Sequence, residues 1–115
     1  MKRLAPLALL LFMLGCQKAV VPRPGSIDKL DSVTYDTLLV AQALLDNTKI
    51  AIQQGKLPAS TKQIVNEAGR AYTVLRDCWL QYRAAPNEET SQRIANASLR
   101  VNKFIAELRG LGVQP

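Results

Sequence analysis

Two cysteines are the most reactive side chains in this sequence, and their surroundings differ. Cys16 directly follows an apolar run, whereas Cys78 lies within an amphipathic stretch. A thiol can be acylated, can form a disulfide, or can act as a nucleophile once it is ionised. The chain has no histidine, the commonest general base and the commonest metal ligand in proteins. The chemistry open to this chain therefore depends on how each cysteine is presented.

The apolar run before Cys16 extends from Leu4 to Leu14 and follows two basic residues, Lys2 and Arg3. A basic start, a short apolar core and a small residue at the end are typical of a secretory signal peptide. The run is too short to cross a bilayer, because a spanning helix needs about 20 apolar residues. We therefore predict an export signal over residues 1–15.

The end of the run resembles the lipobox of bacterial lipoproteins. The residues that carry this resemblance are Met13-Leu14-Gly15-Cys16. It implies cleavage between Gly15 and Cys16 and a diacylglycerol thioether on the cysteine sulfur. Each buried CH₂ contributes about 0.8 kcal/mol, so two or three acyl chains would hold the protein at a membrane. The alternative is an ordinary signal peptide in which the cysteine stands by chance.

The same resemblance has a consequence for location. In Gram-negative lipoproteins an aspartate after the acylated cysteine retains the protein in the inner membrane. Gln17 occupies that position here. We therefore expect a protein of the bacterial cell envelope, in the outer membrane and facing the periplasm if the cell is Gram-negative.

Residues 16–25 form the expected link between the lipid and the fold. Pro22, Pro24 and Gly25 interrupt regular structure. An extended segment of this length spans no more than about 30 Å. The folded part is therefore expected to stay close to the membrane.

Residues 26–110 carry apolar side chains at three- and four-residue spacing, the period of an α-helix. No segment shows the sustained alternation of a β-strand. We predict an all-α fold, an antiparallel up-down-up three-helix bundle, with a flexible tail over residues 111–115. The stripe of the first helix is broadened by Val33 and Val40. If two helices do not cover that stripe fully, a homo-oligomer is expected.

Capping residues and glycines predict where the helices begin and end. Ser26 is the expected N-cap of the first helix, with Asp28 and Asp31 near the positive end of its dipole. Ser60 and Gln63 fit a capping box for the second helix. The remaining expected signals are the stop at Gly55, the end before Pro86, the cap at Asn87 and the stop at Gly110.

Cys78 has two interpretations. It could be a redox thiol or the partner of an intermolecular disulfide. It also lies on the expected apolar stripe, three residues after Leu75 and four before Tyr82. A cysteine in such a position behaves as a small hydrophobic residue. We therefore interpret Cys78 as buried and inert.

The second helix also carries the candidate contact residues. Aromatic side chains at helical spacing are typical of a core, with their polar tips reaching the surface. Two arginines seven residues apart share a face with the leucine between them, and such a strip could dock a partner or an anionic surface. The candidate partner or ligand contacts are Tyr72, Arg76, Trp79, Leu80, Tyr82 and Arg83.

Composition argues against several classes of function. The net charge of +6 falls to +4 when Lys2 and Arg3 are removed, which is not the dense basic patch of a nucleic-acid binder. The sequence has no glycine-rich phosphate loop, no clustered metal ligands and no Ser-His-Asp set. We expect no catalytic residues, no metal and no cofactor.

These features together predict a non-enzymatic envelope lipoprotein. It is held at the membrane through acyl chains on Cys16 and binds or scaffolds an envelope protein or an anionic envelope surface. The alternative is a small-ligand or lipid binder with a pocket between helices near Tyr72, Trp79 and Tyr82. An exposed apolar patch outside a filled core favours the first function, whereas an internal cavity of about 300 Å³ favours the second.

The anchor is tested by replacing its sulfur. Cys16→Ser is expected to move the protein from the membrane fraction to the soluble fraction, because the acylated sulfur is lost. Fractionation followed by immunoblotting measures this. Retention of the variant in the membrane fraction would contradict the lipid anchor.

Overall fold

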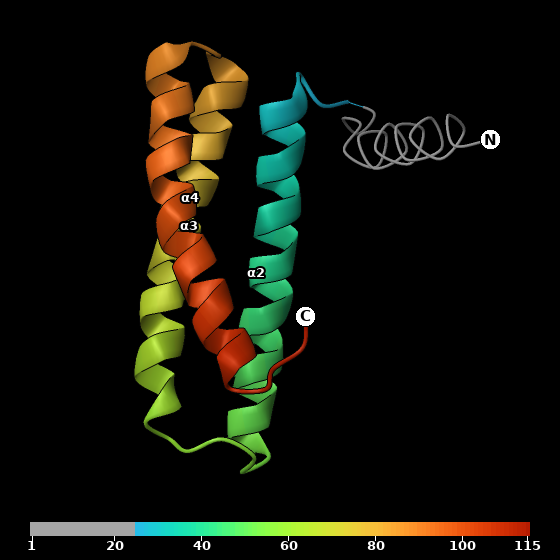
Figure 1. The fold of residues 1–115 in the computed structure, drawn as a ribbon, viewed down its shortest axis with the longest axis vertical. Helices are drawn as coiled ribbons and strands as arrows, with labels where there is room; N and C mark the ends of the chain where they lie inside the picture. The colour runs from blue at the N-terminus through green and yellow to red at the C-terminus, as the bar shows by residue number, and fades with distance from the viewer. Residues whose placement is uncertain (1–24) are drawn as a thin grey trace, which may run out of the picture.

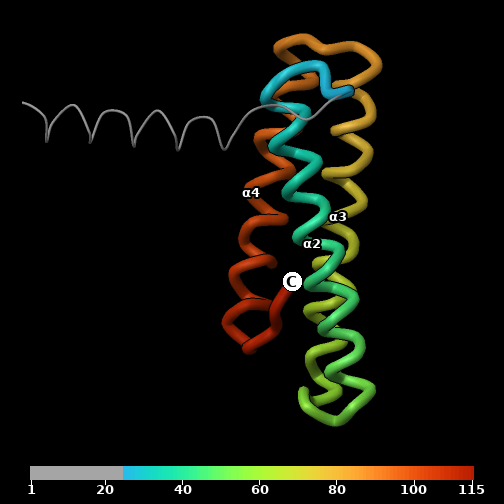
Figure 2. Tube along the Cα trace, turned by 90° about the vertical axis from the view of Figure 1, so that its right-hand side faces the viewer, coloured from blue at the N-terminus to red at the C-terminus, as the bar shows by residue number. Residues whose placement is uncertain are grey.

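Three α-helices pack side by side in the computed structural model, which describes residues 25–115 (Figure 1). They are α2 (Lys29–Gln53), α3 (Thr61–Ala84) and α4 (Glu88–Gly110). α3 runs back along α2, α4 reverses again, and every pair of helices is in contact (Figure 2). This arrangement confirms the predicted all-α three-helix bundle. The predicted signal peptide, Cys16 and most of the linker lie outside the described residues.

Each helix buries one stripe of side chains in a common core. The stripe arises because apolar residues recur at the helical period and the remaining positions are polar. Among residues 25–115, no helix is both long and apolar enough to cross a membrane. A gap in the core beside Ala41, Phe104 and Leu108 measures about 10 Å³, which is room for one water at most. The most deeply buried apolar side chains are Leu44, Leu75, Ile94, Val101 and Leu108.

The stripe of α2 is narrower than expected. Val33 is largely exposed and Val40 is only partly buried. Thr34, Leu38 and Ala41 form the buried line instead. Val33 lies about 100° around the helix from Thr34 and is 41% exposed. Val33 therefore does not widen the core, which corrects the prediction.

The start of α2 also differs from the prediction. Asp28, not Ser26, is the N-cap, and its Oδ1 accepts a hydrogen bond from the Asp31 N–H at 2.9 Å. Asp28 has the extended backbone that an N-cap requires. The end agrees with expectation, since the helix stops two residues before Gly55, whose φ is +73°. Glycine adopts this left-handed conformation without strain.

The capping box predicted for α3 is wrong. Ser60 has helical backbone angles, and its side chain makes no capping hydrogen bond. Its hydroxyl is therefore not directed at the N–H of Gln63. Instead, consecutive i→i−3 backbone bonds satisfy the first N–H groups, from Thr61 to Pro58 at 3.0 Å and from Lys62 to Ala59 at 3.1 Å. The predicted end before Pro86 is confirmed, because α3 finishes at Ala84.

The start of α4 has the predicted cap. Asn87 accepts from the Thr90 N–H at 2.9 Å, and the Thr90 hydroxyl accepts from the Asn87 N–H at 3.1 Å. This reciprocal pair is a capping box that the sequence analysis did not identify. The helix includes Gly110 rather than stopping before it. The left-handed residue is Gly112, with φ of +88°.

The tail differs from the flexible segment that was expected over residues 111–115. Val113 is buried in the core, and its N–H bonds to the Leu108 carbonyl at 3.3 Å. The Gln114 carbonyl accepts from Asn47 Nδ2 at 2.7 Å. These contacts hold the tail against α2, because Gly112 turns the chain back toward the bundle (Figure 1).

Two leucines test the core. Leu75 is 0% exposed and Leu99 is 73% exposed, and both lie inside helices. Leu75→Ala is expected to lower the free energy of unfolding by about 2–5 kcal/mol, because it leaves a cavity. The matched control Leu99→Ala is expected to change it by less than about 0.5 kcal/mol. Urea denaturation followed by circular dichroism measures both, and equal effects would contradict this packing.

Candidate functional site

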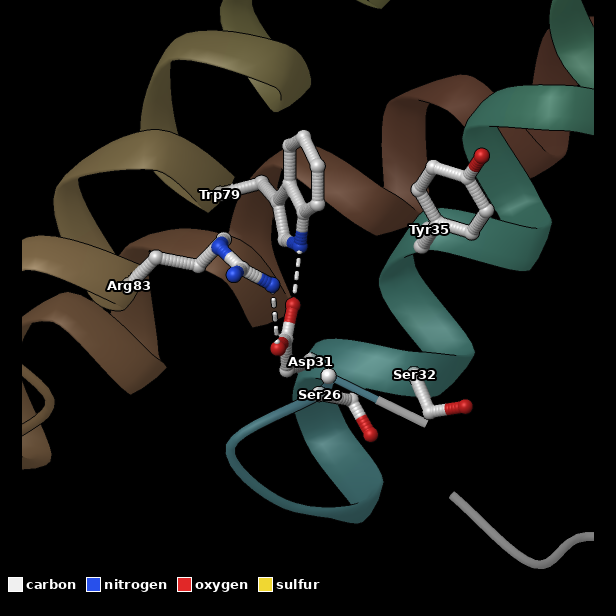
Figure 3. A pocket seen from close by; sticks show the side chains of 7 residues that line it. Ser26, Asp31, Ser32, Tyr35, Trp79 and Arg83 are labelled. Atoms are coloured by element: carbon white, nitrogen blue, oxygen red, sulfur yellow. Dashed lines mark hydrogen bonds and ion pairs between the residues drawn. The ribbon is translucent and has the colours of Figure 1, made fainter. Parts of the chain in front are cut away.

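A buried carboxylate joins the start of α2 to the end of α3. Asp31, in the first turn of α2, is 1% exposed. Its Oδ2 accepts from the Ile27 N–H at 2.8 Å and from Arg83 at 2.7 Å, and its Oδ1 accepts from the indole N–H of Trp79 (Figure 3). Both oxygens are therefore engaged, by two side chains of α3 and by a backbone N–H of the segment that enters α2.

These donors determine the charge of Asp31. Burial raises the pKa of the carboxyl, but the hydrogen bonds from Ile27, Trp79 and Arg83 and the charge of Arg83 together outweigh it. The net result is a pKa below the usual value of 3.8. The group is therefore ionised at neutral pH, where it forms an ion pair with Arg83.

A second carboxylate makes a parallel contact. The Tyr82 hydroxyl, on a buried side chain of α3, donates to Asp28 Oδ2. That hydrogen bond to a carboxylate, with burial as a second cause, raises the pKa of Tyr82 above its usual value of 10.0. Asp28 thus caps α2 and also binds α3. We call Asp28, Asp31, Trp79, Tyr82 and Arg83 the carboxylate clamp.

An open groove lies beside the carboxylate clamp. The ring of Tyr35 lies 5.6 Å from that of Trp79, with the planes tilted by 38°. The Arg83 guanidinium lies 5.4 Å from the centre of the Trp79 ring, within cation–π range. Figure 3 shows these side chains around the opening. The described residues that line the groove are Gly25, Ser26, Asp31, Ser32, Tyr35, Trp79 and Arg83.

The groove continues into a wider surface along the two helices. The Tyr72 hydroxyl donates to Gln42 Oε1 at 3.3 Å, which marks the boundary between α2 and α3 two turns further along. Leu39 lies four residues after Tyr35 and is 41% exposed. Residues three and four apart share one side of a helix. We call this surface the α2–α3 face, and its residues are Tyr35, Leu39, Tyr72, Arg76, Trp79, Leu80 and Arg83.

Most of the predicted contact residues lie on this face. The exception is Tyr82, which points to Asp28 inside the carboxylate clamp. Leu80 is 50% exposed, and Arg76 lies 3.7 Å from Asp77 with both side chains about half exposed. Cys78 is partly buried, packs against the core, and is a free thiol. Contacts therefore join Trp79 with Arg83 and Tyr72 with Gln42, whereas Arg76 and Leu80 are placed on this side of α3 by helical spacing.

Several residues of this site were not identified from the sequence. Tyr35 and Leu39 lie on α2, and only its packing against α3 brings them beside Trp79. Asp31 was interpreted as a dipole partner. A signal for its burial was present, because it lies three residues before Thr34 and seven before Leu38, on the buried line of α2.

The site offers contact groups rather than reactive ones. Asp31 is fully engaged by its donors, and the Tyr82 hydroxyl is engaged by Asp28. Within residues 25–115, no group of three His, Cys, Asp or Glu side chains could hold a metal ion. The α2–α3 face presents aromatic rings, leucine side chains and two guanidinium groups. Such groups are suited to binding a surface.

Comparisons with protein-family models, with curated proteins and with solved structures found no match to this chain. Its function is therefore inferred from its own contacts. The carboxylate clamp and the α2–α3 face are the features that distinguish this chain from a plain apolar bundle.

The carboxylate clamp has a testable pH dependence. Asp31→Asn is expected to lower the free energy of unfolding at pH 7 by about 1–3 kcal/mol, because a hydrogen-bonded charge pair is lost. The pKa of Asp31 is lowered in the folded state, so its stabilisation is complete above the unfolded value of 3.8 and is lost as pH falls through the lowered folded value. The difference between wild type and variant should therefore shrink toward pH 2.

Asp46→Asn is the matched control. Asp46 lies on the exposed side of the same helix, so its replacement should change the free energy of unfolding by less than about 0.5 kcal/mol. Urea denaturation at a series of pH values measures both variants. A deficit for Asp31→Asn that stays constant from pH 7 to pH 2 would contradict the ionised pair.

Proposed function

We propose that this protein is a small lipid-anchored protein of the bacterial envelope that acts as a non-enzymatic binding or scaffolding module. Its binding surface is the α2–α3 face. The observation that carries this proposal is a set of aromatic, leucine and arginine side chains on one face, two of which are fixed by buried Asp31.

The anchor part of the proposal rests on residues 1–16. The lipobox resemblance places the acylated cysteine at Cys16 and makes it the first residue of the mature chain. Gly25, which lines the groove beside Trp79, follows a short linker with two prolines. Along the chain, therefore, the anchor is close to the edge of the groove at Gly25, and the packing of α3 against α2 brings Trp79 and Arg83 to the same groove.

The binding part rests on preorganisation. Trp79 and Arg83 are held by Asp31, so their side chains lose little conformational entropy when they contact a partner. Tryptophan, tyrosine and arginine are the residues that most often dominate binding energy at interfaces. A fixed Trp79 beside Arg83 therefore supports a contact role better than a purely structural one.

The packing of the core favours this function over the alternative of a ligand pocket between helices. The gap among the core side chains is about 10 Å³, whereas pockets for small ligands begin at about 300 Å³. The groove beside Trp79 is larger, about 730 Å³, but it is open to solvent and is not a cavity enclosed between helices. Tyr72 and Trp79 lie at the boundary between α2 and α3 and point to polar partners on α2. The exposed leucines Leu39 and Leu80 lie outside the core, where they can contact a partner.

Two variants, each with one photo-crosslinking residue, test the binding face in the envelope of living cells. One replaces Leu80 on the α2–α3 face, and the other replaces Leu99 on α4, the same residue type with a more exposed side chain. Irradiation of cells that express the anchored chain is expected to give a reproducible adduct, with protein or with lipid, at position 80 and none at position 99. Adducts of equal yield at both positions, or none at position 80, would contradict the assigned face.

A further inference from the structure

We propose that the α2–α3 face rests on the phospholipid headgroup surface of the same membrane that holds Cys16. This inference depends on the proposed lipid anchor and names the occupant of the proposed binding face. It is carried by the position of the face next to the linker, by its residue types and by its size.

The position follows from the length of the linker. The residues between Cys16 and Gly25 extend no more than about 30 Å. Gly25 and Ser26 line the groove together with Trp79, so the linker meets the folded domain at this face. α2 has 25 residues and is about 38 Å long, so the Gly55 end of the bundle is further from Gly25 than the length of the linker. The end of the α2–α3 face that carries Tyr35, Trp79 and Arg83 is thus the part of this face that a short tether holds nearest the bilayer.

The residue types match a membrane interface. Tryptophan and tyrosine are enriched where headgroups meet acyl chains, because each ring has an apolar body and a polar tip. Leu39 and Leu80 add exposed aliphatic surface on the same face. Arginine can lay its stem on apolar surface and keep its guanidinium among headgroups.

The arginines retain donors for phosphate. Arg83 gives one nitrogen to Asp31, and Arg76 has a single long contact of 3.7 Å with Asp77. A guanidinium has five N–H donors, so most remain available to phosphodiester oxygens. Arg76 and Arg83 lie two turns apart with Leu80 between them, which places an aliphatic side chain between two phosphate contacts.

The size of the face favours a bilayer over a protein. A stable protein interface uses about 20–30 residues on each side, whereas the α2–α3 face has seven defined members. A face this small binds weakly in free solution. A tether to the same surface makes the contact intramolecular and raises its effective concentration to about the millimolar range. The bilayer that holds Cys16 is the surface whose effective concentration at the α2–α3 face is raised by the tether.

The single tryptophan of the chain provides a direct test. The acylated mature protein, which begins at Cys16, is reconstituted in vesicles of phosphatidylethanolamine and phosphatidylglycerol, with or without lipids brominated near the headgroup. Flotation reports whether the protein is anchored, and quenching of Trp79 fluorescence reports contact with lipid. We expect the protein to float and the brominated lipids to quench Trp79 at least twofold.

Two labelled variants supply the matched control. In a Cys78→Ser background, Leu80→Cys and Leu99→Cys each carry a nitroxide, while acylation protects the sulfur of Cys16. We expect the label at position 80 to be shielded from a water-soluble relaxation agent and the label at position 99 to be exposed to it.

The outcomes separate the two proposals. Flotation with unquenched Trp79 and equal exposure of both labels would overturn the lipid contact and leave the anchor standing. Failure to float would overturn the anchor and the lipid contact together. A protein crosslinked at position 80 in cells, with Trp79 unquenched in vesicles, would assign the face to a protein instead.

Discussion

The ionised carboxylate of Asp31 is the constraint on which the start of this bundle depends. A charge with almost no exposure to water is costly unless donors replace its hydration. Here the Ile27 N–H, the Trp79 indole and the Arg83 guanidinium replace it. These groups come from the segment before α2 and from the end of α3. The carboxylate is therefore satisfied only when both segments are in place.

The carboxylate clamp also explains how one turn of helix serves two purposes. Asp28 caps α2 and binds Tyr82, whereas Asp31 binds Trp79 and Arg83. The apolar stripes that hold the rest of the bundle are non-directional, since burial depends on area rather than on orientation. Hydrogen bonds to two carboxylates have fixed geometry. They determine which rings and guanidinium groups are presented beside Gly25, and therefore what the α2–α3 face can contact.

The sequence predicted the parts of this structure that depend on local pattern. Three periodic stripes predicted the three helices, and Asn87 was correctly chosen as a cap. Ser26 was predicted as the cap and Asp28 was assigned to the helix dipole, but Asp28 is the cap, because the position of the cap depends on where the chain turns into α2. Asp31 was assigned to the helix dipole because its partners, Trp79 and Arg83, are 48 and 52 residues away. The periodicity of one helix does not predict contacts with another helix. For the same reason, Tyr35 and Leu39 were not identified as neighbours of Trp79.

The carboxylate clamp fixes the direction in which the chain enters the bundle from the linker. A tether controls the distance of a domain from a membrane, but it does not control which face the domain presents. Here the N–H of Ile27, just after the linker, is bonded to the same carboxylate that holds Trp79 and Arg83. The direction in which the chain enters the bundle is therefore coupled to the orientation of those two side chains. Under the proposed lipid anchor, a short linker and a fixed entry would together restrict the domain to orientations with the α2–α3 face near Cys16, which a flexible first turn would not do.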